Sequence, residues 1–258
     1  MSLGVLFVAH GTRNVQGITS SIAFAGEVMA AAARQIPELL TVPQKTSFLE
    51  LASPTIAEGV AELVGRGVRQ LIVVPLLLLS AGHVKRDIPL LFASARREHP
   101  QLSVILTSPL DDHPRLIGIH LDHLRDYPSS TEFPHARIFV SRGSQDVGAY
   151  QPWTRLMESV RVRSPITPRT FAFLAGWGTS LTDALTRVNR AGYRQAVIVP
   201  HLLFPGRLAD SVQQTVAVID SAEGNGFSRI DVTPLLFEHP ATALAFADLL
   251  VAAVQRTP

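Results

Sequence analysis

The chain has 258 residues, of which 47% are hydrophobic and 17% charged, a balance that excludes a disordered protein. The net charge of +2 gives no argument for a nucleic-acid partner, and the absence of cysteine excludes disulfides and thiol chemistry. The longest apolar run, Leu71–Leu79, is too short to cross a bilayer, which needs about 20 residues, and the N-terminus lacks the basic segment of a signal peptide. We therefore expect a soluble, cytoplasmic protein without a membrane partner.

In chain order, the first half alternates short apolar segments with segments of helical periodicity. Strands are predicted near Gly4–Ala9, Thr46–Leu49, Gln70–Val74 and Ser103–Thr107, and helices over Ile18–Gln35, Ser53–Val64 and Asp87–Glu98. In the second helix, Ser53 is expected as the N-cap and Pro54 as the first helical residue. Because the strands are continuous runs of Val, Ile and Leu, they predict a parallel sheet that is covered on both faces.

The same pattern occurs a second time in the chain. Four segments recur in order at offsets of 125 to 132 residues: Val5–Gly11 with Arg137–Gly143, Gly67–Pro75 with Gly192–Pro200, Ser108–Leu110 with Thr233–Leu235, and His113–Pro114 with His239–Pro240. A period this long indicates two homologous domains, and the proline-containing segment Tyr127–Pro134 is predicted to link them. The expected fold class is α/β, with two tandem doubly wound parallel-sheet domains, residues 1–128 and 135–258, and a cleft between them.

Three polar residues of the first half follow predicted strands. His10 and Glu50 come after the first and second strands, and His83 comes after the segment that contains the third. Ligands of open α/β sheets bind beyond the carboxyl ends of the strands, so these side chains can converge on one site. Two imidazoles and a carboxylate suit a divalent first-row metal, and imidazole also accepts protons near neutral pH. Taken singly, each histidine is more often a loop or capping residue, and Glu50 a favourable charge at a helix N-terminus.

The second half offers a comparison within the same chain. At the positions that match His10, Glu50 and His83 it has Arg142, Ala175 and Arg207. Arginine stays protonated and cannot bind a metal ion. The sequence therefore predicts that only the first half carries the site.

The remaining histidines are weaker candidates. His120 and His123 are three residues apart on a predicted helix, a spacing that allows metal binding but is commoner on a solvated face. His201 follows a predicted strand and could line the cleft. Turn or capping roles are expected for the others, which are His99, His113, His135 and His239. The chain has no P-loop, no complete GxGxxG and neither the GxSxG nor the HExxH motif, which disfavours nucleotide binding, serine hydrolysis and zinc proteolysis.

Three segments carry a resemblance to a known family. Ala9–Arg13, Phe48–Glu50 and Leu79–Pro89 resemble the sirohydrochlorin chelatases, which are class II chelatases that insert a divalent metal ion into a tetrapyrrole. The resemblance covers essentially the whole chain, including a degenerate second domain. It implies that His10, Glu50 and His83 are the metal-binding and catalytic residues. It also implies that a five-residue segment lies against the macrocycle, namely Leu78, Leu79, Ser80, Ala81 and Gly82.

The resemblance further implies the reaction. Metal insertion releases two pyrrole protons, and the sequence favours Fe²⁺, giving sirohaem, because it has neither the histidine-rich stretch nor the cysteine cluster of some cobalt-type relatives. Co²⁺ or Ni²⁺ insertion is the alternative, since the same donor residues accept these ions. The metal is a substrate, and no organic cofactor is expected. Because two fused halves can supply the cleft that single-domain relatives assemble by dimerising, we expect a monomer.

The substrate implied by the resemblance, sirohydrochlorin, is an anion with many carboxylates. Several basic residues could hold these groups, and for each of them a surface ion pair is an equally good interpretation: Arg13, Lys85, Arg86, Arg142 and Arg207.

Two other functions stay open on the sequence. His10-Gly11-Thr12 also resembles the histidine phosphatases, although those enzymes have an arginine where this chain has Ala9. A non-catalytic tetrapyrrole or metal carrier would use the same residues without turnover.

Overall fold

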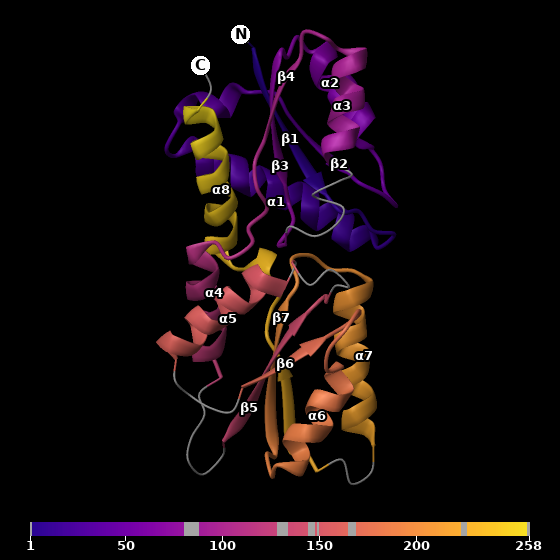
Figure 1. Cartoon of the computed structure of the whole chain (residues 1–258), viewed down its shortest axis with the longest axis vertical. Coiled ribbons are helices and arrows are strands. Elements are labelled where there is room, and N and C mark those ends of the chain that lie inside the picture. The colour runs from indigo at the N-terminus through magenta and orange to yellow at the C-terminus, as the bar shows by residue number, and fades with distance from the viewer. Residues whose placement is uncertain are drawn as a thin grey trace. The chain divides into compact units, whose positions relative to one another are not determined.

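The computed structural model describes residues 2–79, 88–127, 134–143, 148, 150–164, 169–222 and 226–256. The chain divides into two compact units (Figure 1). The first unit consists of Met1–Asp111 together with Pro240–Pro258, and the second of Asp112–His239. No helix in the described ranges is long and apolar enough to cross a membrane.

The first unit is built on a four-stranded parallel sheet with the strand order β2-β1-β3-β4. Its elements are β1 (Leu3–Ala9), α1 (Val15–Ala33), the 3₁₀ helix η1 (Pro37–Thr41), β2 (Gln44–Phe48), α2 (Ile56–Gly65), β3 (Gln70–Pro75), α3 (Ile88–Glu98), β4 (Ser103–Leu106) and α8 (Pro240–Gln255).

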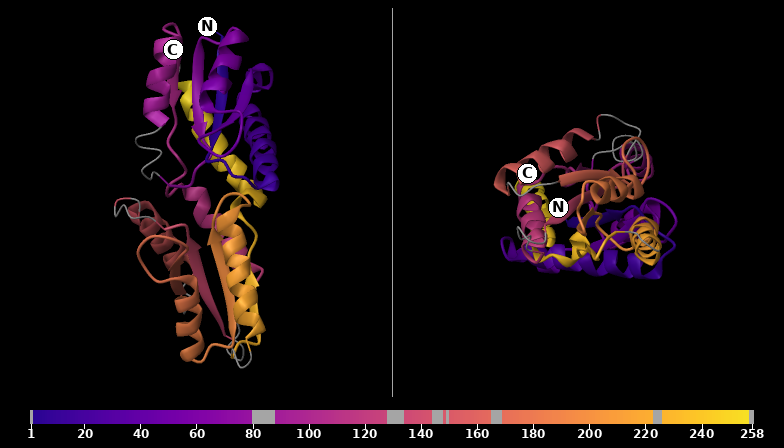
Figure 2. Two further views of the ribbon diagram at one scale, coloured as in Figure 1. Left: turned by 90° about the vertical axis from the view of Figure 1, so that its right-hand side faces the viewer. Right: turned by 90° about the horizontal axis from the view of Figure 1, so that it is seen from below.

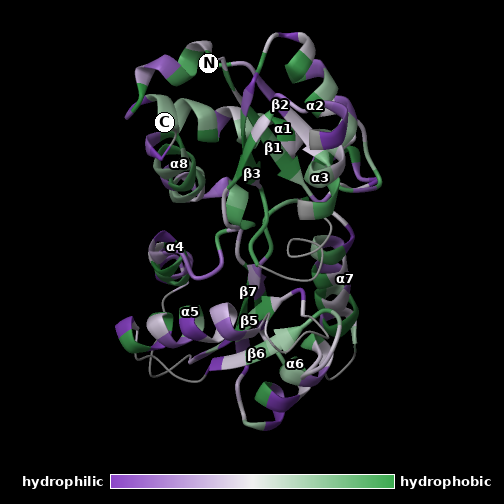
Figure 3. Ribbon diagram, turned by 45° about the horizontal axis from the view of Figure 1, so that its top comes forward, coloured by the Kyte–Doolittle hydropathy of each residue, from purple (hydrophilic) through white to green (hydrophobic). Residues whose placement is uncertain are grey.

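Helices cover both faces of this sheet, as the continuous apolar strands predict. Leu6, Val8 and Val73 pack against α2 and α3 on one face. Helices α1 and α8 pack against each other on the other face, where the rings of Phe24 and Phe246 meet edge to face at 5.7 Å. Strands β1 and β3 are mostly hydrophobic in Figure 3, and all strand pairs of this sheet are parallel, as predicted.

The second unit repeats this topology with the strand order β6-β5-β7-β8, again all parallel. Its elements are α4 (Pro114–Arg125), β5 (His135–Ser141), α5 (Tyr150–Arg163), β6 (Arg169–Phe173), α6 (Leu181–Arg190), β7 (Gln195–His201), α7 (Arg207–Ser221), β8 (Arg229–Val232) and the 3₁₀ helix η4 (Leu236–Glu238). Helices α6 and α7 cover one face through Ile138, Leu185 and Val212, and α4 and α5 lie on the other. The predicted fold class of two doubly wound α/β domains is confirmed.

The compact units do not follow the predicted domain boundary at 128/135. Helix α8, which ends the second repeat, packs on α1 and β3 of the first unit, and α4, which ends the first repeat, packs on α5 of the second (Figure 2). The two repeats have thus exchanged their last helices. The periodicity of a helix shows that one of its faces packs on an apolar surface. Because the two homologous sheets offer equivalent surfaces, the sequence does not show which sheet the helix covers.

The second helix begins later than predicted. Its N-cap is Thr55, not Ser53, and the first helical residue is Ile56. The Thr55 hydroxyl accepts a hydrogen bond from the Glu58 backbone N–H, and the Glu58 carboxylate accepts one from the Thr55 backbone N–H at 2.7 Å. The sequence Thr55-Ile-Ala-Glu58 is the signature of this capping box, and it is a stronger signal for the start of the helix than Ser53-Pro54.

Candidate active site

The strand order places the candidate site at the carboxyl edge of the sheet in the first unit. Strand β1 lies between β2 and β3 in the sheet. The chain connects β1 to β2 on one side of β1 and then returns to β3 on its other side, so the connections diverge between β1 and β3. Ligands of doubly wound sheets bind at such a point. His10 directly follows β1, and Leu76–Leu79 directly follow β3, so both flank this position.

His10 and Glu50 come together at this edge, as predicted. The His10 Nδ1 and Glu50 Oε1 atoms are 3.4 Å apart, and 31% of the histidine side chain and 50% of the glutamate side chain are exposed. The glutamate is half-exposed, whereas the imidazole is partly exposed with its Nε2 atom buried, and the two groups are near enough to act on one ligand. The pair can hold a cation and take up a proton.

The backbone beneath the pair fixes its spacing. The Glu50 N–H donates a hydrogen bond to the His10 carbonyl at 3.1 Å. Gly11 follows with a φ of +94°, and a Cβ atom there would lie 1.7 Å from the Glu50 carbonyl oxygen. Only glycine fits this approach, so Gly11 is a steric requirement of the site.

The other predicted site residues are described in part. His83 lies outside the described residues, as do Ser80, Ala81 and Gly82. Leu78 and Leu79 are half-buried at the carboxyl edge. In the part of the chain that the structure describes, no three His, Asp or Glu side chains are grouped to hold a metal ion.

Leu51 is a residue of this edge that the sequence prediction missed. Its φ is +63°, and its side chain is 55% exposed directly after Glu50. A leucine in the left-handed region is strained, and such strain is found mainly at functional sites. At the matching position the second repeat has Gly176, whose φ is +77°. Aligning the two repeats could therefore have singled out Leu51.

The second unit keeps the backbone of the site without its polar side chains. Ala175 N–H donates to the Arg142 carbonyl at 2.9 Å, and a Cβ atom on Gly143 would lie 1.9 Å from the Ala175 carbonyl oxygen. These contacts reproduce those of Glu50, His10 and Gly11. The predicted correspondence of His10 with Arg142 and of Glu50 with Ala175 is confirmed.

The predicted clamps are exposed where the structure describes them. Arg13 lies just before Asn14, the N-cap of α1, and Arg207 is the first residue of α7. Arg142 directly follows β5. Their guanidinium groups are accessible to an anionic ligand. Lys85 and Arg86 lie outside the described residues.

Three histidines are buried in the second unit, which corrects two predictions. His120 and His123 lie on α4 but not on a solvated face, and His201 does not line an open surface. His120 Nε2 and His201 Nδ1 are 3.1 Å apart, within hydrogen-bond distance. Burial lowers the pKa of His120 well below its ordinary range, that of His123 to about 4 and that of His201 to about 3. All three are neutral at neutral pH and belong to the core.

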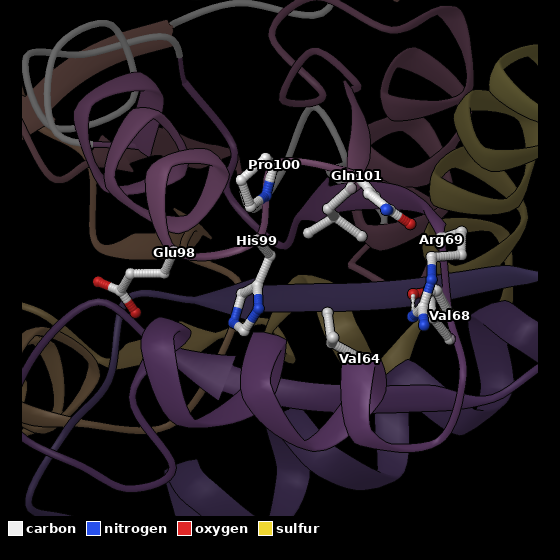
Figure 4. Close-up of a pocket in the computed structure, with 8 residues that line it drawn as sticks. Val64, Val68, Arg69, Glu98, His99, Pro100 and Gln101 are labelled. Carbon is white, nitrogen blue, oxygen red and sulfur yellow. Dashed lines mark hydrogen bonds between the residues drawn. The ribbon is translucent and has the colours of Figure 1, made fainter.

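A hollow of about 360 Å³ lies at the opposite edge of the first sheet (Figure 4). Arg69 and Val68 before β3, and Glu98, His99 and Leu102 around the connection from α3 to β4, help to line it. It is distant from the carboxyl ends of the strands and holds none of the predicted site residues. We assign it no part in the site.

Comparison with known families gives a match over both repeats. The family model described as CbiX matches residues 4–127 and again residues 136–253. The two matched ranges cover nearly the whole chain and coincide with the two repeats of the sequence.

Named relatives and a solved structure agree with this match. The chain is 28% identical to the sirohydrochlorin ferrochelatase of Priestia megaterium over 211 residues, which are 81% of this chain and 76% of that protein. It is 25% identical to the sirohydrochlorin cobaltochelatase of the same organism, with 82% and 68% covered. The structure of SirB from Bacillus subtilis with Fe³⁺ is similar with a TM-score of 0.79 at 25% identity, covering 97% of this chain and 94% of that one.

Proposed function

The chain belongs to the CbiX family, and from this membership we propose that it is an enzyme that inserts a divalent metal ion into sirohydrochlorin. The observation that carries the proposal is the His10–Glu50 pair at the carboxyl edge of the first unit. The second repeat keeps the same backbone but replaces both side chains. The pair is thus not required by the fold.

The metal ion is a substrate in this proposal. His10 and Glu50 hold it at the carboxyl edge, with His83 as the proposed third ligand. Insertion requires that the ion lose water and that two pyrrole nitrogens lose protons. Imidazole accepts a proton from a pyrrole nitrogen, and the adjacent carboxylate balances the positive charge that results. The half-exposed Glu50 carboxylate, 3.4 Å from His10 Nδ1, lets the proton pass to solvent.

The macrocycle is proposed to lie over the apolar part of this edge. Leu51, Leu78 and Leu79 offer partly exposed side chains to its face. The resemblance adds Ser80, Ala81 and Gly82, which lie outside the described residues, to the proposed contacts with the macrocycle. Arg13, in the same unit, is the proposed partner of one of its carboxylates, because a guanidinium group pairs with a carboxylate through two parallel hydrogen bonds.

Fe²⁺ is the proposed metal, which makes sirohaem the product. The ferrochelatase relative supports it, and the sequence has no cysteine and no histidine-rich stretch. The cobaltochelatase relative supports Co²⁺ as the alternative, which the same nitrogen and oxygen donors accept.

The chain itself supplies the variants that test the proposal. H10R, E50A and H83R install the residues of the second repeat, and the second unit shows that this backbone folds with Arg142 and Ala175. Insertion is followed anaerobically by the absorbance of sirohydrochlorin with Fe²⁺, Co²⁺ or Ni²⁺, beside reactions without enzyme. We expect at least a 100-fold loss of rate in each variant with unchanged circular dichroism, which is the scale of losing a general base.

The outcomes separate the competing functions. Multiple turnovers by the wild type establish an enzyme, and the metal with the largest acceleration over the uncatalysed rate identifies the reaction. Tight binding of sirohydrochlorin without turnover would favour a carrier. Full activity of H10R and E50A would refute the proposed site.

A further inference from the structure

Two arginines lie side by side on the sheet of the second unit. Arg137 on β5 and Arg169 on β6 are direct partners in the register of the two parallel strands, so their side chains leave the same face. Arg137 is only 2% exposed, and Arg169 is half-buried. Since Ile138 and Val140 point to α6 and α7, Arg137 points to the opposite face.

In the arginine pair, Arg137 and Arg169, five of the six side-chain nitrogens have no hydrogen-bond acceptor among the described residues. The Nε and Nη1 atoms of Arg137 and all three side-chain nitrogens of Arg169 are buried, and none has a partner in the described part of the chain. Burying a charged group without compensation is costly, and such groups are normally paired. Two adjacent like charges without acceptors are therefore an unusual feature of a folded core.

The charges near the pair do not cancel. Burial lowers the pKa of both arginines, and for Arg169 the neighbouring Arg137 and Arg161 lower it further. Guanidinium groups nevertheless stay protonated in proteins, so the charge persists. Among the described residues, the carboxylate that acts on Arg169 is Glu158, which is already bound to Arg161, whose Nε donates to it at 2.7 Å. Counted over these described residues, three cations and one anion leave an excess of two positive charges.

The fold does not require arginine at these positions. In the first unit, the equivalent neighbours in the strand register are Val5 and Gln44, which carry no charge. The same topology therefore forms with a neutral pair. The arginines are a property of the second repeat alone, which points to a role other than folding.

We infer that the arginine pair is a binding site for a doubly charged tetrahedral oxyanion, of the class of phosphate and sulfate. Five donor nitrogens without protein acceptors match the several oxygens of such an ion, and the excess of two positive charges matches its charge. The pair lies toward the amino ends of β5 and β6, away from the strand ends where Arg142 lies. The inference does not depend on the proposed chelatase activity.

Thermal unfolding of the whole chain tests the inference. Both tryptophans of the chain, Trp153 and Trp177, lie in the second unit, so their fluorescence reports the unfolding of that unit. The wild type is compared with R169Q and with the double variant R137V/R169Q, which copies Val5 and Gln44. Each is measured in sodium phosphate, sodium sulfate, sodium acetate and sodium chloride at matched ionic strength.

In the wild type, we expect phosphate and sulfate to raise Tm by about 3–6 °C over chloride at ten times their dissociation constant. Acetate, a singly charged planar ion, should have a smaller effect. Neither variant should show the increase, and in chloride the double variant should melt higher than the wild type, because it removes two unpaired buried charges. Fluorescence titration at 25 °C should give saturable phosphate binding to the wild type alone.

Equal shifts in all three proteins would show a general salt effect and would overturn the site. A double variant that melts lower than the wild type in chloride, with no anion effect in the wild type, would show that the arginines are structural. A larger shift with acetate than with phosphate would overturn the assigned ligand class.

Discussion

At the scale of single residues, the carboxyl edge of the first unit is shaped by backbone that most side chains do not allow. Gly11 must approach the Glu50 carbonyl closely, and Leu51 adopts a positive φ although it has a Cβ. The sequence identifies the first through the His-Gly pair that follows a strand. It does not identify the second, because leucine has no intrinsic preference for a positive φ.

Leu51→Gly should therefore affect stability and activity in opposite directions. Removing the strained left-handed leucine should raise the free energy of unfolding of the first unit by about 1 kcal/mol, measured by circular dichroism in urea. Loss of its exposed apolar side chain should raise the KM for sirohydrochlorin severalfold, in keeping with the proposed function.

Leu40→Gly is the matched control for this substitution. Leu40 is also exposed but has no positive φ, so its replacement by glycine should only destabilise. If Leu51→Gly lowers stability as Leu40→Gly does, the strain assigned to Leu51 is absent.

At the scale of elements, α8 shows where the sequence pattern stops being informative. Its buried alanines pack closely against the alanine-rich α1. The sequence cannot show which of two homologous sheets it covers. The two repeats share their hydrophobic pattern, so the choice rests on tertiary contacts such as Phe24 with Phe246.

Phe246→Ala tests this assignment, because Phe246 belongs to the second repeat in sequence and to the first unit in structure. The loss of a fully buried ring should cost the first unit about 3–5 kcal/mol. We expect the unfolding transition seen by circular dichroism to shift, while the tryptophan fluorescence transition of the second unit keeps its midpoint.

Val218→Ala on the exposed side of α7 serves as the control and should change neither transition. A shift of the fluorescence transition in Phe246→Ala, with the first unit unaffected, would contradict the assignment of α8.

At the scale of the whole molecule, the histidines of the second unit make stability depend on pH. His120 faces His201 and His123, and His123 also faces His239, Asp122 and Asp126. The folded pKa values of His123 and His201 are about 4 and about 3, against about 6.5 in the unfolded chain. Between these values the unfolded state binds more protons, so the unit is most stable above pH 6.5 and loses stability as the pH falls toward 4.

Each such histidine contributes a slope of about 1.4 kcal/mol per pH unit within this window. His201→Leu copies Leu76, the residue that follows the corresponding strand of the first repeat, and removes one titrating group. Urea unfolding followed by tryptophan fluorescence between pH 7.5 and 4.5 should give a slope that is smaller by about this amount. An unchanged slope would show that His201 titrates alike in both states.

The sequence thus predicts the repeat, the parallel sheets and the meeting of His10 with Glu50. All three follow from local patterns and from the rule that the ends of parallel strands share an edge. It misplaces His120 and His123, because a spacing of three residues assigns two side chains to one helix face without showing what that face meets. The exchange of α4 and α8 is hidden for the same reason.

The exchange has a consequence for how a chain of two repeats arises. A single repeat would carry a last helix shaped for the sheet of another copy, so it could complete its core only by associating with a twin. Two separate copies associate only when the protein concentration is high enough. When both copies are in one chain, each has the other at a fixed effective concentration, so the two stay associated even at low protein concentration. With both copies in one chain, the polar pair is needed in only one of them, and the second copy has Arg142 and Ala175 where the first has His10 and Glu50.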